Sequence, residues 1–202
     1  MANKKQMVFI MTDTQRWDMV NCYRETGLST PCLDALAADG ELRLSALLSP
    51  LCTAQDQERA LGVLKRLHCS NKTVNRVLLA LAGALGAFEE DDAALRVQAK
   101  VALGSHGMET IEDIAVLAGV LRAADDVQRA KRFAAHAAAA RERGLCCSLK
   151  ELAVTGADIM PIAGKGPKVG AMLTALLDAV IREEIPNERE ALLDAAAGMG
   201  EK

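Results

Sequence analysis

A basic segment, Arg59–Arg76, carries residue types that could bind a phosphate backbone. It contains no acidic residue, although the whole chain has a formal net charge of −3. Each lysine or arginine that meets a phosphate releases a counterion, so such binding would weaken steeply with salt. A solvated helix face would show the same pattern, and this alternative stays open. The candidate phosphate contacts here are Lys65, Arg66, Lys72 and Arg76, with Arg59 beside them.

A glycine-rich turn, Gly164–Gly170, is a second candidate anion site. Its GKGPKVG sequence has the pattern of a helix-hairpin-helix, in which glycines permit positive φ and the free N–H groups of the next helix point at an anion. A purely structural hairpin of two helices is the alternative. We expect Gly166→Glu to abolish the anion contact and to leave the fold intact. The candidate contacts are Lys165, Gly166, Lys168 and Gly170.

Catalysis requires spacings that no set of residues in the chain provides. The acidic pairs Asp91-Asp92 and Asp125-Asp126 are adjacent, and adjacent side chains on a helix diverge by about 100°, so neither pair can face one metal ion. Such pairs are typical of helix N-termini. No Asp-x-Asp pair occurs, and the three histidines are scattered without a nucleophile partner. We therefore predict no catalytic residue.

The composition places these segments in a helical protein. Half of the residues are apolar and only 2% are aromatic, which favours helices packed on helices over a β-sandwich or barrel. The longest apolar run, Val77–Phe88, is about a dozen residues long, whereas a membrane span needs roughly 20. Six cysteines without zinc-binding spacing indicate reduced thiols. We expect a cytoplasmic protein without membrane contact and a mainly all-α fold, an irregular helical bundle.

Hydrophobic periodicity and capping residues define the elements that would position the two candidate sites. Met7–Met11 is predicted to form a short isolated β-strand, and a domain boundary follows near residue 40. The predicted domains are 1–40 (strand, loop and helix), 41–145 (helical body) and 146–202 (helical tail with the GKGPKVG hairpin). Beyond residue 40, the predicted helices are 41–49, 55–67, 71–86, 91–103, 109–122, 125–143, 148–153, 168–183 and 187–197.

Three stretches of the chain resemble one enzyme family. They are Leu42–Leu48, Leu64–Val77 and Leu152–Leu193, and the last contains a Val-x-Gly-x-Asp-Ile element, a Gly-Pro-x-x-Gly turn and Pro-Asn-Glu, in that order. From about residue 41 to 202 the chain resembles the C-terminal body and tail of tRNA nucleotidyltransferases (CCA-adding enzymes) and poly(A) polymerases. The resemblance implies an all-α region that holds tRNA for 3′-end processing, with RNA-binding residues at both candidate sites.

In this family a separate N-terminal head adds the nucleotides. The head's chemistry needs a phosphate loop and an Asp-x-Asp metal pair, which this sequence does not contain. The resemblance therefore implies a fragment that lacks the catalytic head and is inactive alone. We expect tRNA as the partner and no cofactor in this chain, with Mg²⁺ expected only for the missing head.

The first 40 residues resemble a different family. MTDTQRWDM and Thr30–Asp34 are similar to the start of sulfatases, which include phosphonate monoester hydrolases, and this resemblance implies a divalent metal at Asp13. Cys52–Asp56 lacks the Pro and Arg of that family's Cys/Ser-x-Pro-x-Arg nucleophile motif. The sequence thus indicates a fusion of two families. The alternatives to the tRNA-binding region are a fragment of a metal-dependent sulfatase-like hydrolase and a non-catalytic helical interaction module that self-associates through its N-terminal apolar segment.

Overall fold

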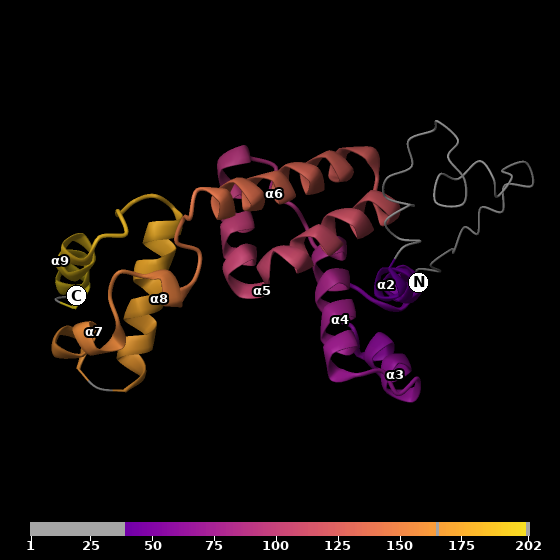
Figure 1. Cartoon of the computed structure of the whole chain (residues 1–202), viewed down its shortest axis with the longest axis horizontal. Coiled ribbons are helices and arrows are strands. Elements are labelled where there is room, and N and C mark those ends of the chain that lie inside the picture. The colour runs from indigo at the N-terminus through magenta and orange to yellow at the C-terminus, as the bar shows by residue number, and fades with distance from the viewer. Residues whose placement is uncertain (1–38, 165, 201–202) are drawn as a thin grey trace, which may run out of the picture. The chain divides into compact units, whose positions relative to one another are not determined.

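Helices form the regular structure in the part of the chain that the computed structural model describes, residues 39–164 and 166–200 (Figure 1). The predicted all-α fold is confirmed there, and the predicted strand Met7–Met11 lies outside the described residues. No helix in the described part is both long and apolar enough to cross a membrane. The elements are α2 (Gly40–Leu48), η2 (Ser49–Leu51), α3 (Glu58–Arg66), α4 (Asn71–Leu85), α5 (Asp92–Leu121), α6 (Ala124–Glu142), η3 (Leu149–Glu151), α7 (Gly156–Ala163), α8 (Pro167–Ile181) and α9 (Arg189–Gly200).

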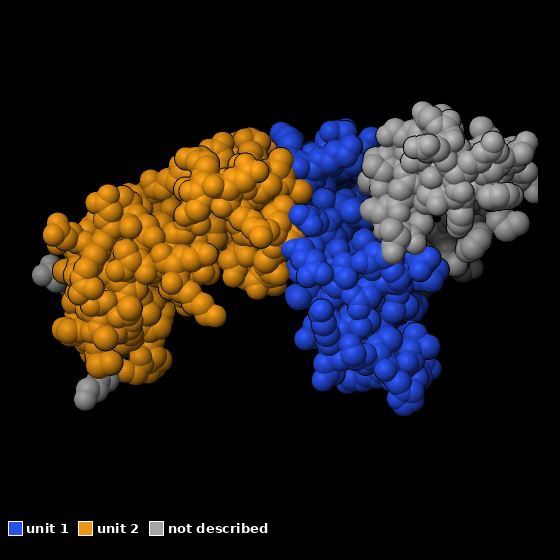
Figure 2. Space-filling model, in the orientation of Figure 1, with its two compact units in different colours: residues 1–88, 109–132 blue, residues 89–108, 133–202 orange. Residues whose placement is uncertain are grey.

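The described chain divides into two compact units (Figure 2). Unit 1 contains residues 39–88 and 109–132, and unit 2 contains residues 89–108 and 133–200. Both α5 and α6 contribute residues to each unit. The predicted domain boundaries near residues 40 and 145 stay a prediction, because a compact unit need not be a domain that folds alone.

In unit 1, side-chain caps define where α2 and α4 begin. The Oδ1 atom of Asp39 accepts hydrogen bonds from the N–H groups of Glu41 (2.8 Å) and Leu42 (3.1 Å). The Oγ atom of Ser70 accepts one from the N–H of Thr73 at 3.1 Å. Such caps satisfy backbone donors that have no partner inside the helix. Between these helices and α3, the fully buried core side chains include Leu64, Val77 and Leu81.

A break at Gly107 divides α5. This residue has a φ of 79° and a ψ of 171°, which are not helical angles, and only glycine adopts them at little cost. The residues before the break belong to unit 2, and those from Glu109 onward belong to unit 1. The sequence predicted separate helices over 91–103 and 109–122, in agreement with this break.

In unit 2, one carboxylate positions the first turn of α7. An Oδ2 atom of Asp158 accepts hydrogen bonds from the N–H (2.8 Å) and the hydroxyl (2.7 Å) of Thr155. The other carboxylate oxygen accepts one from Arg189 at the start of α9. These bonds, first those from Thr155 and then that from Arg189, lower the pKa of Asp158 to about 2. The buried side chains between α7, α8 and α9 include Ile159, Leu176 and Leu192.

Two predicted elements differ from the structure. The sequence pattern missed α7 because its eight residues include Pro161, and proline is rare inside helices since it removes a backbone donor. The helix predicted over 148–153 is only the short 3₁₀ turn η3. This turn is held by Glu151, whose carboxylate accepts hydrogen bonds from the N–H groups of Cys147 (2.8 Å) and Ser148 (2.9 Å).

Candidate nucleic-acid interface

A tight turn joins α3 to α4 and brings part of the first basic segment together (Figure 1). Two backbone hydrogen bonds of 3.1 Å close it, from the His68 N–H to the Lys65 carbonyl and from the Cys69 N–H to the Leu64 carbonyl. This is the pattern of a Schellman motif, which ends a helix by turning the chain through one left-handed residue. His68 is that residue, with a φ of 54°. The C-terminus of α3 therefore lies beside the N-terminus of α4.

The cations of this turn are exposed. Lys65 and Arg66 lie in the last turn of α3, and Lys72 lies in the first turn of α4. None of the three makes an ion pair within the described residues, and neither does Arg59. Because no carboxylate of the described residues pairs with them, they can bind phosphates without first breaking a contact within that part of the chain. We refer to the surface of this turn as the α3–α4 tip; it consists of Lys65, Arg66, Leu67, His68 and Lys72.

Arg76, the fourth cation predicted in this segment, is placed differently. Its Nε and Nη2 atoms donate to the two carboxylate oxygens of Asp113 at 2.7 and 2.9 Å. Nη2 also donates to Asp39 at 2.8 Å and Nη1 to Glu41 at 2.9 Å, and Glu109 lies 3.6 Å from Nη1. The hydrogen bonds that Arg76 donates to Asp113 are the first cause of the raised pKa of Arg76. We therefore leave Arg76 out of the proposed interface, because carboxylates already surround it.

The partners of Arg76 are residues that sequence reasoning missed. Asp39, Glu41 and Asp113 lie 35 to 37 positions away along the chain. Local patterns report on neighbours within about one helical turn, so they contain no signal for these contacts. Arg76 was grouped with the other cations only because it lies in the same segment.

The second candidate site is a turn between two helices, as its GKGPKVG pattern predicts. α7 ends before Gly164 and α8 begins at Pro167. Gly164 has a φ of 79°, and Gly166 has a φ of 90° with a ψ of −149°. Lys168 and Gly170 are exposed in the first turn of α8, whereas Lys165 lies outside the described residues. The turn thus presents backbone donors and one described cation at a helix N-terminus.

One expectation for this turn needs correction. The substitution Gly166→Glu was expected to remove anion binding with the fold intact. The backbone angles of Gly166 belong to a region that is essentially restricted to glycine. Any side chain there strains the turn, so the substitution would disturb the fold together with the contact.

The chain has a third basic run, which starts at Arg122, just before α6, and continues along α6, and part of it is compensated internally. The carboxylate of Asp126 accepts hydrogen bonds from Arg122 and from Arg129, at 3.0 Å each. Arg122 also donates to the carbonyl of Leu85 at 3.2 Å. These arginines stabilise unit 1 and offer less free charge than the α3–α4 tip.

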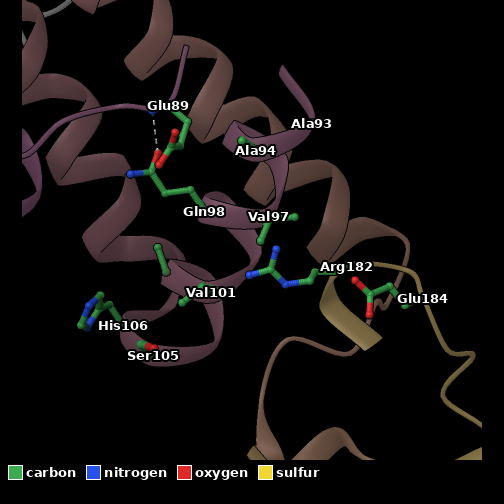
Figure 3. A pocket seen from close by; sticks show the side chains of 11 residues that line it. Glu89, Ala93, Ala94, Val97, Gln98, Val101, Ser105, His106, Arg182 and Glu184 are labelled. Carbon is green, nitrogen blue, oxygen red and sulfur yellow. Dashed lines mark hydrogen bonds between the residues drawn. The ribbon is translucent and has the colours of Figure 1, made fainter. Parts of the chain in front are cut away.

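Unit 2 has a groove of about 770 Å³ along the first part of α5 (Figure 3). Small apolar side chains line it together with Val97 and Val101, and Arg182 reaches across them from the end of α8. The Oε1 atom of Gln98 accepts a hydrogen bond from the Glu89 N–H at 3.3 Å. None of the predicted contact residues lines this groove.

Within the described part of the chain, metal-binding clusters are absent and the Cys146 and Cys147 thiols are buried. Within it, no group of three or more His, Cys, Asp or Glu side chains is placed to hold a metal ion. Asp13, the predicted metal ligand, lies outside the described residues. Burial raises the pKa of the Cys146 and Cys147 thiols, which keeps both in the less nucleophilic protonated form. What the described residues offer is uncompensated positive charge at two helix–helix turns.

Known proteins are similar to this chain over most of its helical region. The family model described as tRNA nucleotidyltransferase domain 2 matches residues 42–196. A CCA-adding enzyme of Lactiplantibacillus plantarum is 26% identical over 152 residues, which are 74% of this chain and 34% of that enzyme. The chain thus spans about a third of the length of this curated relative. No solved structure matches it significantly. The family match begins after residue 40, and the sulfatase resemblance of the first segment has no support in these comparisons.

Proposed function

The chain belongs to the tRNA nucleotidyltransferase domain 2 family, and from this membership we propose that residues 42–196 bind tRNA during 3′-end processing. CCA addition is the activity named for the relative from Lactiplantibacillus plantarum. The printed sequence has no Asp-x-Asp metal pair, and nucleotide transfer needs metal ligands to neutralise the developing phosphate charge. The proposed role of these 202 residues is therefore to bind the RNA and not to add nucleotides by themselves.

Within the structure, the observation that supports this proposal most directly is the free positive charge of the α3–α4 tip. Lys65, Arg66 and Lys72 are exposed and make no ion pair in the described part of an acidic chain. A net negative protein repels RNA as a whole, so binding must depend on such local patches. The family match covers this turn, and it also covers the α7–α8 turn with Lys168 and Gly170.

The experiment that tests the proposal is a salt titration of tRNA binding to the purified 202-residue chain. A blunt RNA duplex with the same number of phosphates serves as competitor. We expect tRNA to bind in preference to the duplex, and its affinity to fall linearly on logarithmic axes as salt rises. Weak binding that does not distinguish the two RNAs would contradict the proposal.

A second assay addresses nucleotide addition. The chain is incubated with Mg²⁺, CTP, ATP and a tRNA that lacks its terminal nucleotides, and the tRNA length is read on a sequencing gel. We expect no extension, because the chain supplies no metal-binding carboxylate pair of the required spacing. Extension by the purified chain would show that the catalytic residues were missed.

A further inference from the structure

The α3–α4 tip exposes an apolar side chain among its cations. Leu67 is 58% exposed, although the preceding leucine of the same helix, Leu64, is fully buried. Leu67 lies at the C-cap of α3, next to Lys65 and Arg66. A phosphate backbone offers a leucine side chain nothing to bury against. Single exposed leucines are common on protein surfaces, and Leu47 is more exposed still. What distinguishes Leu67 is its place among cations that make no ion pair within the described residues, where an RNA ligand that also offers an apolar surface could use it.

The neighbouring residue, His68, is also unusual for its position. Its φ of 54° lies in the left-handed region, which at the end of a Schellman motif is most often occupied by glycine. A side chain in this conformation brings its β-carbon close to the backbone, and glycine avoids that crowding. His68 is exposed, so burial of its ring does not explain why a ring is present there. A backbone cost retained at an exposed turn points to a role for the side chain.

We propose that the α3–α4 tip binds unpaired nucleotides of RNA. In this arrangement the His68 ring stacks on a base, Leu67 packs against the same or the next nucleotide, and Lys65, Arg66 and Lys72 hold the flanking phosphates. This inference rests on the proposed function and narrows its ligand to a single-stranded loop or end. Bases in such regions are unstacked and can lie on an aromatic side chain, whereas the bases of a duplex are stacked on one another.

The arrangement of charge supports RNA over an apolar protein partner. Lys65 and Arg66 precede the exposed pair Leu67-His68 and Lys72 follows it by four residues, so cations stand on both sides of the pair along the chain. Together with the N-terminus of α4, whose N–H groups point toward the turn, they match a ligand with an apolar face and anions at both edges. A nucleotide has this pattern.

The test uses the full chain with His68→Gly and His68→Phe. Glycine removes the ring and relaxes the left-handed backbone, so the melting temperature should stay the same or rise. Phenylalanine keeps a ring. The two ligands are an RNA hairpin with an unpaired loop and a blunt duplex of equal phosphate number. We expect His68→Gly to weaken hairpin binding about tenfold, the size typical of one lost base stack, with duplex binding unchanged and hairpin binding retained in His68→Phe.

A matched pair of leucine variants completes the design. Leu67→Ser should weaken hairpin binding, whereas Leu149→Ser, which changes a leucine of similar exposure in unit 2 (48% exposed), should not. Hairpin binding that is unaffected by His68→Gly and Leu67→Ser would overturn this inference, although salt-sensitive tRNA binding by the wild type would leave the proposed function standing. Equal losses for hairpin and duplex would also overturn it. If the wild type binds neither RNA at any salt concentration, both proposals fail.

Discussion

Arg76 and Asp113 form a two-pronged ion pair inside unit 1. Nε and Nη2 of the guanidinium donate to the two oxygens of one carboxylate at 2.7 and 2.9 Å, and the side chain of Asp113 is only 6% exposed. Planar arginine matches a carboxylate in this way, which adds directional preference to charge attraction. The pair joins α4 to the second part of α5, and through Asp39 and Glu41 the same arginine also contacts the start of α2.

Replacing this arginine should destabilise unit 1. In Arg76→Gln the buried carboxylate of Asp113 loses its cation. Because Arg76 is partly exposed, we expect the free energy of unfolding to fall by about 2–3 kcal/mol. Urea unfolding followed by circular dichroism measures this change. Arg96→Gln is the control, because its ion pair with Asp92 is half exposed on both sides and such pairs contribute about 0–1 kcal/mol. Equal effects of the two variants would contradict the structural role of Arg76.

The α3–α4 tip should determine the salt dependence of tRNA binding. Lys65→Gln and Lys72→Gln each remove one phosphate contact, so each should lower the slope of log affinity against log salt by about 1. Lys131→Gln, at an exposed lysine of α6 outside both candidate sites, should leave the slope unchanged. Fluorescence anisotropy with labelled tRNA between low and physiological salt gives the slopes. A decrease for Lys131→Gln as large as for the tip lysines would indicate diffuse binding over the surface.

The turn between α7 and α8 should tolerate a change of charge better than a change of backbone. Lys168→Gln should reduce tRNA affinity with little effect on stability, because its side chain is exposed. Gly166→Ala should instead destabilise unit 2 by about 1–3 kcal/mol, since a non-glycine residue at a φ of 90° is strained. Melting temperatures and tRNA titrations on the same samples separate the two effects. A stable Gly166→Ala protein would show that the turn can rearrange.

Two helical glycines should respond to alanine with opposite signs. A β-carbon at Gly104 in α5 would clash with the carbonyl oxygen of Cys147, which is a backbone atom. Gly104→Ala should therefore destabilise the protein by about 2 kcal/mol, as overpacking does. A β-carbon at Gly62 in α3 meets nothing within 4 Å, so Gly62→Ala should stabilise it by about 0.5–1 kcal/mol through the higher helix propensity of alanine. Urea midpoints of both variants test the signs.

The stability of unit 2 should depend on pH through Asp158. Its pKa is about 2 in the folded chain against an ordinary value of 3.8. A carboxyl with a lowered folded pKa stabilises the fold fully above the unfolded pKa, and the contribution is lost as pH falls through the folded value. The melting temperature should therefore fall between about pH 4 and pH 2 by more in the wild type than in Asp158→Asn. If the melting temperatures of the wild type and of Asp158→Asn fall equally over this pH range, Asp158 is not the group responsible.

The helical architecture was predictable because its causes are local. The helix start at Asn71 and the interruption between the predicted helices 91–103 and 109–122 each depend on residues within about one turn of chain, and apolar periodicity located most helices to within a few residues. α7 was missed for a reason of the same kind. Pro161 opposes helix locally, and the burial of Ile159 between α8 and α9 outweighs it, which no local pattern could reveal.

The candidate binding residues were likewise only partly predictable from the sequence. By itself, the sequence predicted a mainly all-α fold, which the described residues confirm, with cations concentrated in one segment and a glycine-defined turn in another, since composition and spacing are properties of the chain alone. Only the tertiary structure decided which of those cations are free. Lys65 and Arg76 carry the same charge in the same segment, yet carboxylates 35 to 37 positions away surround Arg76 and none pairs with Lys65 in the described residues. Charge attraction depends on distance in space, and folding brings those carboxylates to one arginine and leaves the lysine exposed to solvent.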